Sequence, residues 1–233
     1  MTEPAGGAPS GEVVVLAAAS LREAFTAIGA AFEERHPAVS VTFGFGGSSG
    51  LATQIVSGAP ADVFAAASTS TMATVVEGLG PGTKSAVPAV LAKGVMVLAV
   101  PRANRAGVTG LADLAREDVS FAVCLPEVPC GAVADRVLAT AGVDASPVTF
   151  EKDVTAVLVK VRADEVDAGF VYATDVDESV LAIELPPHLD ATTSYPILAL
   201  PQAPNPDTAA AFTAFVLSPE GRAILVEHGF LAP

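Results

Sequence analysis

Short apolar runs alternate with amphipathic stretches in the first part of the sequence, and this alternation constrains the fold more than any other feature. The run Val13–Ala19 is followed by an amphipathic stretch over Leu21–Arg35, and Val39–Phe45 is followed by Gly50–Ser57. Short apolar runs between helices are typical of parallel strands that are buried on both faces. The sequence therefore predicts an α/β fold that opens with two strand-helix pairs.

Later runs continue the alternation. Strands are expected at Val63–Ala67, Val95–Val100, Phe121–Cys124, Ala168–Tyr172 and Ile197–Leu200, and helices at Gly131–Ala141, Val154–Arg162 and Pro206–Leu217. Prolines bracket two of these strands: Pro88 and Pro101 enclose one, and Pro196 and Pro201 enclose the other. Proline marks element ends, and each bracketed strand is long enough to pass between two lobes as a hinge.

Length and composition fit this prediction. With 233 residues, of which 51% are hydrophobic, the chain can bury one large core or two of roughly 100 residues each. The apolar runs are far shorter than the roughly 20 residues that a membrane-spanning helix needs.

The first twelve residues, Met1–Glu12, are rich in Gly, Pro, Ala and Ser and lack apolar periodicity. We expect residues 1–12 to form a flexible leader. They have neither the basic start nor the apolar centre of a signal peptide. A secreted chain that had been trimmed would begin in this way, and so would a cytosolic protein with a flexible end.

The charge balance argues against nucleic acid as a partner. Twelve Lys and Arg residues against 26 Asp and Glu residues give a formal net charge of -14, which repels nucleic acid and anionic membrane surfaces. The acidity says less about small anions, because a buried site is governed by local dipoles rather than by screened surface charge.

Two cysteines occur, in the segment Cys124-Leu-Pro-Glu-Val-Pro-Cys130. Two prolines in so short a loop favour a disulfide between Cys124 and Cys130, which would add roughly 2 kcal/mol of stability and indicate an oxidising compartment. A metal site is the weaker interpretation, because the spacing is not that of a zinc knuckle and no pair of His residues stands nearby. Cys-x-x-Cys, the redox-active pattern, is absent.

Two helix starts in succession carry Ser and Gly. Ser20 follows Ala17-Ala18-Ala19 at an expected N-cap, and Gly46-Gly47-Ser48-Ser49-Gly50 precedes the second helix. Helix starts attract anions, and in a parallel sheet both lie at the carboxyl ends of strands, where ligands bind. Each feature alone also fits an ordinary cap or a flexible loop. The glycine patterns of dinucleotide and nucleoside triphosphate sites are missing.

An ordered set of short segments resembles the periplasmic molybdate-binding proteins, from about Val13 to the C-terminus. The segments are Ala17–Leu21, Gly47–Leu51, Gly58–Phe64, Pro126–Gly131, Lys152–Val154, Gly169–Tyr172, Tyr195–Pro196 and Gly229–Phe230. The resemblance implies a two-lobed periplasmic-binding-protein fold of type II, in which each lobe is a mainly parallel sheet flanked by helices and two hinge strands join the lobes. Residues 13–90 with 200–233 would form the first lobe, and residues 91–199 the second.

The same resemblance implies a ligand, molybdate or tungstate, and the residues that donate hydrogen bonds to it. The match places these donors at Ser20, Ser48, Cys130, Val154 and Tyr172. Ser49 could replace Ser48 under a shift of one residue. Cys130 stands where the family commonly carries a small residue such as Ala, so a disulfide would stiffen that wall, whereas a free thiol would make the site redox-sensitive.

Neutral donors suit molybdate, because the dianion has four oxygens and no proton to donate, and a hydrogen-bond acceptor facing it would be left unsatisfied. For this reason Asp153 and Asp175 are interpreted as helix-start or loop carboxylates and excluded as ligands. Asp62 likewise has a structural role in this interpretation.

The function implied by the resemblance is capture of the oxyanion in the cleft between the lobes and delivery to an ABC permease with its cytoplasmic ATPase. The protein would be an extracytoplasmic monomer, anchored by lipid through a leader that this sequence lacks, without a cofactor and without a nucleic-acid partner. Alternatives are another oxyanion such as sulfate, or a ligand-sensing domain of the same fold. An enzyme is disfavoured, because no Gly-x-Ser-x-Gly elbow is present.

Overall fold

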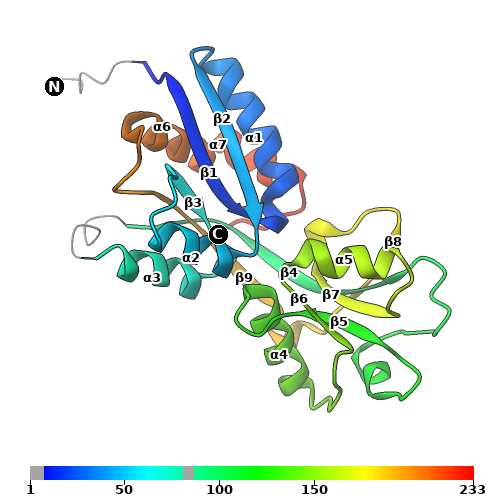
Figure 1. The fold of residues 1–233 in the computed structure, drawn as a ribbon. Coiled ribbons are helices and arrows are strands. Elements are labelled where there is room, and N and C mark those ends of the chain that lie inside the picture. Colours follow the sequence, from blue (N-terminus) through cyan, green and yellow to red (C-terminus); the bar gives the residue numbers. More distant parts are fainter. Residues whose placement is uncertain (1–7, 81–86) are drawn as a thin grey trace.

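The computed structural model describes residues 8–80 and 87–233 (Figure 1). Within them, nine strands form a mixed sheet in the order β2-β1-β3-β9-β4-β7-β5-β6, with β8 paired to β4. The strands are β1 (Gly11–Ala18), β2 (Val39–Gly46), β3 (Val63–Ala65), β4 (Ala89–Pro101), β5 (Phe121–Cys124), β6 (Thr149–Glu151), β7 (Ala168–Tyr172), β8 (Val180–Glu184) and β9 (Thr192–Ala199). The helices are α1 (Arg22–Arg35), α2 (Ser48–Val56), α3 (Thr69–Gly78), α4 (Pro129–Ala141), α5 (Val154–Arg162), α6 (Pro206–Leu217) and α7 (Pro219–Glu227).

Two groups of parallel strands make up most of the sheet. β2, β1 and β3 are parallel, and so are β6, β5 and β7. The connecting strands β4 and β9 pair antiparallel with their neighbours, as does β8. The α/β fold is thus confirmed, with parallel strands inside each group. The sheet as a whole is mixed because β4 and β9 run between the groups.

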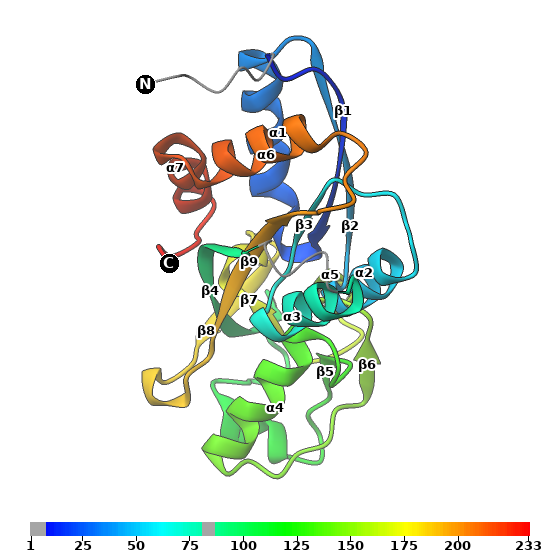
Figure 2. The ribbon, with the colours of Figure 1, turned by 90° about the vertical axis from the view of Figure 1, so that its left-hand side faces the viewer.

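Helices cover both faces of the first strand group (Figure 2). Helices α1, α6 and α7 share one core with the β1 side chains Val13, Val15 and Ala17. Helices α2 and α3 form a second core around Phe64 on the opposite face. Helices α4 and α5 pack on β5 and β7 in a third core, whose buried members lie between Met96 and Ala191 except for Ala19. Figure 1 shows the two strand groups joined by β4 and β9.

The two proline-bracketed strands do connect the groups. Residues 89–95 of β4 pair with β9, and residues 96–101 pair with β7 and β8. Both strands begin earlier than the sequence predicts, β4 at Ala89 and β9 at Thr192. In β4 the pair Lys93-Gly94 interrupts the apolar run, and β9 opens with the polar residues 192–194, which conceals both strand starts. Pairing between the two strands satisfies their backbone. The lobe boundaries near residues 90 and 200 stay a prediction.

Several predicted boundaries are corrected by backbone pairing. Gly11 and Glu12 belong to β1, paired with Val39 and Ser40, so the expected leader is not flexible to its end. Its first seven residues lie outside the described part of the chain. Helix α2 begins at Ser48 rather than Gly50. The sequence pattern also misses α3, β6 and β8, because β6 has three residues, β8 is mostly exposed and α3 begins with polar residues.

The structural role expected for Asp62 is confirmed. Its buried carboxylate accepts hydrogen bonds from the backbone N–H of Val14 in β1, at 2.8 Å, and of Asn205 before α6, at 2.7 Å. The carboxylate therefore ties β1 to the start of α6, and charge-assisted bonds of this kind are among the stronger ones in proteins.

The predicted disulfide between Cys124 and Cys130 is present, with the two Cα atoms 5.7 Å apart. Cys124 ends β5 and Cys130 lies in the first turn of α4, and both are buried. Gly131 follows, and a Cβ there would lie 2.1 Å from the Leu125 carbonyl oxygen. The disulfide and this close approach hold the start of α4 against the loop that follows β5.

Asp175 closes a short 3-10 turn, η4 (Ala173–Asp175), directly after β7. Its carboxylate accepts a hydrogen bond from the Tyr172 backbone N–H at 3.0 Å. Burial raises the pKa of Asp175 to about 7, and the charges of Glu23 and Asp153 act in the same direction, whereas the Tyr172 N–H and Arg162 lower the pKa. Asp175 is partly buried, and its negative charge is costly at neutral pH and absent in acid.

Loss of the disulfide should lower stability. We expect a reductant to reduce the free energy of unfolding by about 2 kcal/mol, because the open loop has more freedom in the unfolded chain. Urea unfolding of the wild type with and without reductant measures this. The variant Cys124→Ala/Cys130→Ala should not respond to reductant. An unchanged wild-type midpoint after verified reduction would contradict the expectation.

Asp175 should make stability decrease as pH rises. Its pKa is about 7 in the folded protein against an ordinary 3.8, so between these values the folded state binds more protons than the unfolded state. Stability then falls with increasing pH. Urea unfolding from about pH 4.5 to 8 should show Asp175→Asn gaining roughly 1 to 4 kcal/mol over the wild type, with most of the gain by pH 7.

The control for this trend is Asp177→Asn. The exposed Asp177 has its pKa lowered by hydrogen bonds from Ser179, so this variant should show no such gain above pH 5. A difference between the wild type and Asp175→Asn that stayed constant with pH would contradict the role assigned to Asp175.

Candidate functional site

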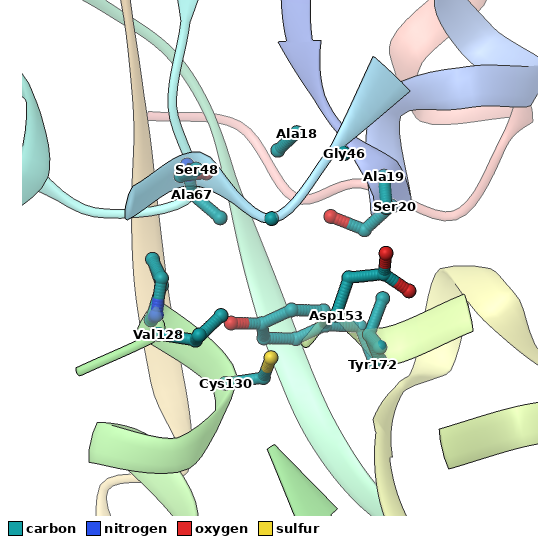
Figure 3. Close-up of a pocket in the computed structure, with 13 residues that line it drawn as sticks. Ala18, Ala19, Ser20, Gly46, Ser48, Ala67, Val128, Cys130, Asp153 and Tyr172 are labelled. Carbon is teal, nitrogen blue, oxygen red and sulfur yellow. The ribbon is translucent and has the colours of Figure 1, made fainter. Parts of the chain in front are cut away.

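A small cavity lies where the carboxyl ends of strands from both groups meet helix starts (Figure 3). The enclosed space is tight, and part of it is open to solvent. The cavity is lined by Ala18, Ala19, Ser20, Gly46, Gly47, Ser48, Ala67, Val128, Pro129, Cys130, Asp153, Val154 and Tyr172. It therefore brings together the five residues that the sequence predicts as ligands.

Helix starts form much of the wall. Ser48 is the first residue of α2, Cys130 the second of α4 and Val154 the first of α5. The first N–H groups of a helix have no acceptor within the helix, and among the described residues no backbone acceptor is found for the Cys130 and Val154 N–H groups. These two N–H groups can donate hydrogen bonds into the cavity. Together with the positive ends of the helix dipoles, they favour an anion there.

Ser20 does not cap α1, contrary to the sequence prediction. The chain first makes a 3-10 turn, η1 (Ala19–Leu21), and α1 starts only at Arg22, with Leu21 at its N-cap position and no side-chain cap. The Ser20 hydroxyl is instead 2.9 Å from the hydroxyl of Tyr195. When Tyr195 donates in this pair, the Ser20 O–H is free to donate into the cavity.

The Ser48 hydroxyl already uses one acceptor position and keeps its proton available. It accepts a hydrogen bond from the Ala67 N–H at 3.0 Å, and the residue is only 2% exposed. A hydroxyl has one donor as well as its acceptor positions, so the Ser48 O–H can donate to a ligand. Ala67 thus orients a residue that lines the cavity.

Tyr172 carries a buried hydroxyl that makes no hydrogen bond in the described part of the protein. The residue is 1% exposed, ends β7 and lines the cavity. The Thr193 hydroxyl, which donates to the Ala67 carbonyl, is near enough to lower the pKa of Tyr172 but is not in hydrogen-bonding geometry with the phenol. Burial raises the pKa of Tyr172 strongly, with Asp175 adding to the effect, so the phenol stays protonated. A buried donor without an acceptor at a cavity wall is suited to a ligand oxygen.

Ser49 and Asp153 differ in their relation to the cavity. Ser49 does not line it, because its hydroxyl donates to the Glu127 carbonyl, which favours Ser48 as the donor. Asp153 does line it (Figure 3), with its carboxylate also accepting the Ala156 N–H at 2.9 Å as the N-cap of α5. The predicted helix-start role of Asp153 is confirmed, and its exclusion as a ligand stays a prediction.

Sequence reasoning missed the two residues that orient the serines, Tyr195 and Ala67. One signal was present in the sequence for Ala67, because Ala65-Ala66-Ala67-Ser68 repeats the Ala17-Ala18-Ala19-Ser20 pattern at another strand end. Nothing local to Tyr195 shows its pairing with Ser20, which is 175 residues away in the chain.

No group of three or more His, Cys, Asp or Glu side chains within residues 8–80 and 87–233 is arranged to hold a metal ion. Across the same residues no single helix is long and apolar enough to span a membrane. Helices α6 and α7 would qualify together by length and composition, although they are bent by 60° at their junction.

Comparison with known proteins identifies relatives of the whole chain. Residues 13–231 match the family model of bacterial extracellular solute-binding proteins. The molybdate-binding protein ModA of Mycobacterium tuberculosis is 40% identical over 99% of this chain and 87% of its own length. That of Escherichia coli is 30% identical over 96% of this chain and 90% of its own.

A solved structure, the periplasmic molybdate-binding protein of Azotobacter vinelandii, superposes with a TM-score of 0.78 at 19% identity, covering 95% of this chain and 99% of that one. At this identity the likeness concerns the fold, which is that of the periplasmic binding proteins. The family-model match over residues 13–231 shows that the chain belongs to the bacterial extracellular solute-binding protein family.

Proposed function

We propose that this protein binds molybdate or tungstate in the cavity and delivers the ion to an ABC permease. The observation that carries the proposal is the Tyr172 hydroxyl, a buried and protonated donor at the cavity wall without an acceptor in the described part of the chain. An oxyanion supplies the missing acceptor. The relatives that are 40% and 30% identical, both molybdate-binding proteins by name, support the choice of ion.

The proposed ligand set consists of neutral donors. Ser20, Ser48 and Tyr172 would give hydroxyl protons, and Cys130 and Val154 would give backbone N–H groups. Hydrogen bonds to a charged acceptor contribute roughly 1.5 to 3 kcal/mol each, and a partly buried helix start can add up to about 2. Several such donors can offset the cost of removing a dianion from water without any Lys or Arg in the set.

The donors come from both strand groups, which suggests how the ion is enclosed. Ser20 and Ser48 belong to the proposed first lobe, residues 13–90 with 200–233, and the other three donors to the second lobe, residues 91–199. Bending of β4 and β9 between the lobes would close the cavity over the ion. The protein would act as a binding protein without a catalytic step.

Family membership and the buried disulfide support an extracytoplasmic location, since disulfides persist in oxidising compartments. In this setting the closed protein would dock as a monomer on a permease driven by a cytoplasmic ATPase. A lipid anchor on a preceding leader would keep it at the membrane.

Calorimetric titration tests the ligand directly. Molybdate and tungstate should each bind at one ion per chain and raise the melting temperature, because bound ligand stabilises the folded state. Sulfate and phosphate serve as comparison anions of similar shape. Absence of heat and of a thermal shift with both metal oxyanions would refute the proposal.

Tyr172→Phe should separate binding from stability. Removing the hydroxyl should weaken binding by roughly 1 to 3 kcal/mol, since a donor to a charged ligand is lost. The free protein should be as stable as the wild type or more so, because a buried group without a partner is removed. Titration and urea unfolding measure the two effects. Unchanged affinity would remove Tyr172 from the site.

Ser20→Ala and Ser48→Ala should also weaken binding by roughly 1 to 3 kcal/mol each. Unlike Tyr172→Phe, they should reduce stability, because they deprive the Tyr195 hydroxyl and the Ala67 N–H of a partner. Ser40→Ala, an exposed position in β2, is the matched control and should alter neither quantity. Affinities that match the control in both variants would exclude the two serines.

A further inference from the structure

The start of α2 touches two segments that lie across the cavity from it. The Ser49 hydroxyl donates a hydrogen bond to the carbonyl of Glu127, 78 positions away in the chain. Beside it, Gly47 packs against the backbone before α5, where a Cβ on Gly47 would lie 2.3 Å from the Lys152 carbonyl oxygen. Both contacts adjoin the cavity, and both join the first strand group to the loops that begin α4 and α5.

Glu127 lies in a loop that is held rigidly. The loop is closed by the disulfide between Cys124 and Cys130. Within it the Leu125 N–H donates to the Glu151 carbonyl and the Val128 N–H donates to the Leu125 carbonyl, each at 2.9 Å. The Glu127 carbonyl is therefore presented at a fixed position. The hydrogen bond between Ser49 and Glu127 uses the side chain of Ser49 and only the backbone carbonyl of Glu127.

Gly47 is required here by space and not by backbone conformation. Its φ of -61° and ψ of 127° are open to any residue. An alanine would fit the local backbone and collide only with the Lys152 carbonyl. A side chain at this position would therefore hold the α2 start away from the α5 start, and would leave each segment undisturbed by itself.

We propose that Gly47 and Ser49 form a clasp that holds the cavity closed over a bound oxyanion. Ser49 does not line the cavity, and Gly47 lines it through its backbone alone, so the role proposed for both is positioning. The inference rests on the proposed function, because it assumes an oxyanion inside the cavity. These contacts belong to the closed form, so removing them favours the open form. The ion should then leave faster, whereas its rate of entry should change little.

The experiment measures the release rate of molybdate by stopped flow, together with the melting temperature of the free protein. Ser49→Ala should release the ion about 2- to 12-fold faster, as expected for one hydrogen bond. Ser49→Thr keeps a hydroxyl and should restore much of the wild-type rate. Gly47→Ala should accelerate release more than Ser49→Ala. All three should leave the melting temperature of the free protein close to that of the wild type.

Two controls test whether the bond itself matters. Glu127→Ala removes the carboxylate and keeps the carbonyl acceptor, so its release rate should stay at the wild-type value. Ser57→Ala removes an exposed hydroxyl after the other end of α2 and should also have no effect.

The outcomes distinguish the clasp from the proposed function. A wild type that binds neither molybdate nor tungstate refutes the function and the clasp together. Binding in the wild type with unchanged release from Ser49→Ala and Gly47→Ala refutes the clasp alone. Faster release from Glu127→Ala than from Ser49→Ala would likewise overturn it, because the carboxylate charge would then control release.

Discussion

Backbone N–H groups without acceptors are the constraint on which the rest of this structure depends. Each helix leaves its first N–H groups unbonded, and α2, α4 and α5 all begin at one cavity. Within each group the parallel strands direct their carboxyl ends to the edge where the helices start. β4 and β9 join the two groups. Such donors are costly to bury alone, so the cavity is complementary to a species made of acceptors.

Local geometry outweighs net charge at this cavity. The formal charge of -14 acts mainly from the surface, where ions screen it within about 8 Å at physiological salt. Two carboxylates lie closer. Asp153 engages the Ala156 N–H, and Asp175, with a pKa of about 7, carries only part of its charge at neutral pH. An acidic protein can therefore present a cavity rich in hydrogen-bond donors. The Asp153 carboxylate is the part of the wall that does not favour an anion.

The sequence predicts the strand-helix turns well because each turn is a local pattern. Two of these turns, at Ser20 and at Ser48, show such a pattern, whereas the resemblance to the molybdate-binding proteins is what implied Cys130, Val154 and Tyr172. The structure gathers all five around one cavity. Features that depend on distant partners could not be predicted. The first halves of β4 and β9 pair with each other across a long stretch of sequence. The 3-10 turn at Ser20 accompanies a contact with a tyrosine 175 residues away.

Adjacent residues at one helix start take different tasks because successive positions of a helix point about 100° apart. Ser48 faces the cavity and receives the Ala67 N–H, whereas Ser49 faces the disulfide-closed loop and Gly47 lies against the backbone before α5. A donor to the ion and two contacts across the cavity thus share one rigid segment. When Ser48 binds the ion, the same segment also holds Ser49 against the Glu127 carbonyl and Gly47 against the backbone at Lys152. Binding of the ion and closure of the cavity are therefore coupled by the geometry of one helix start.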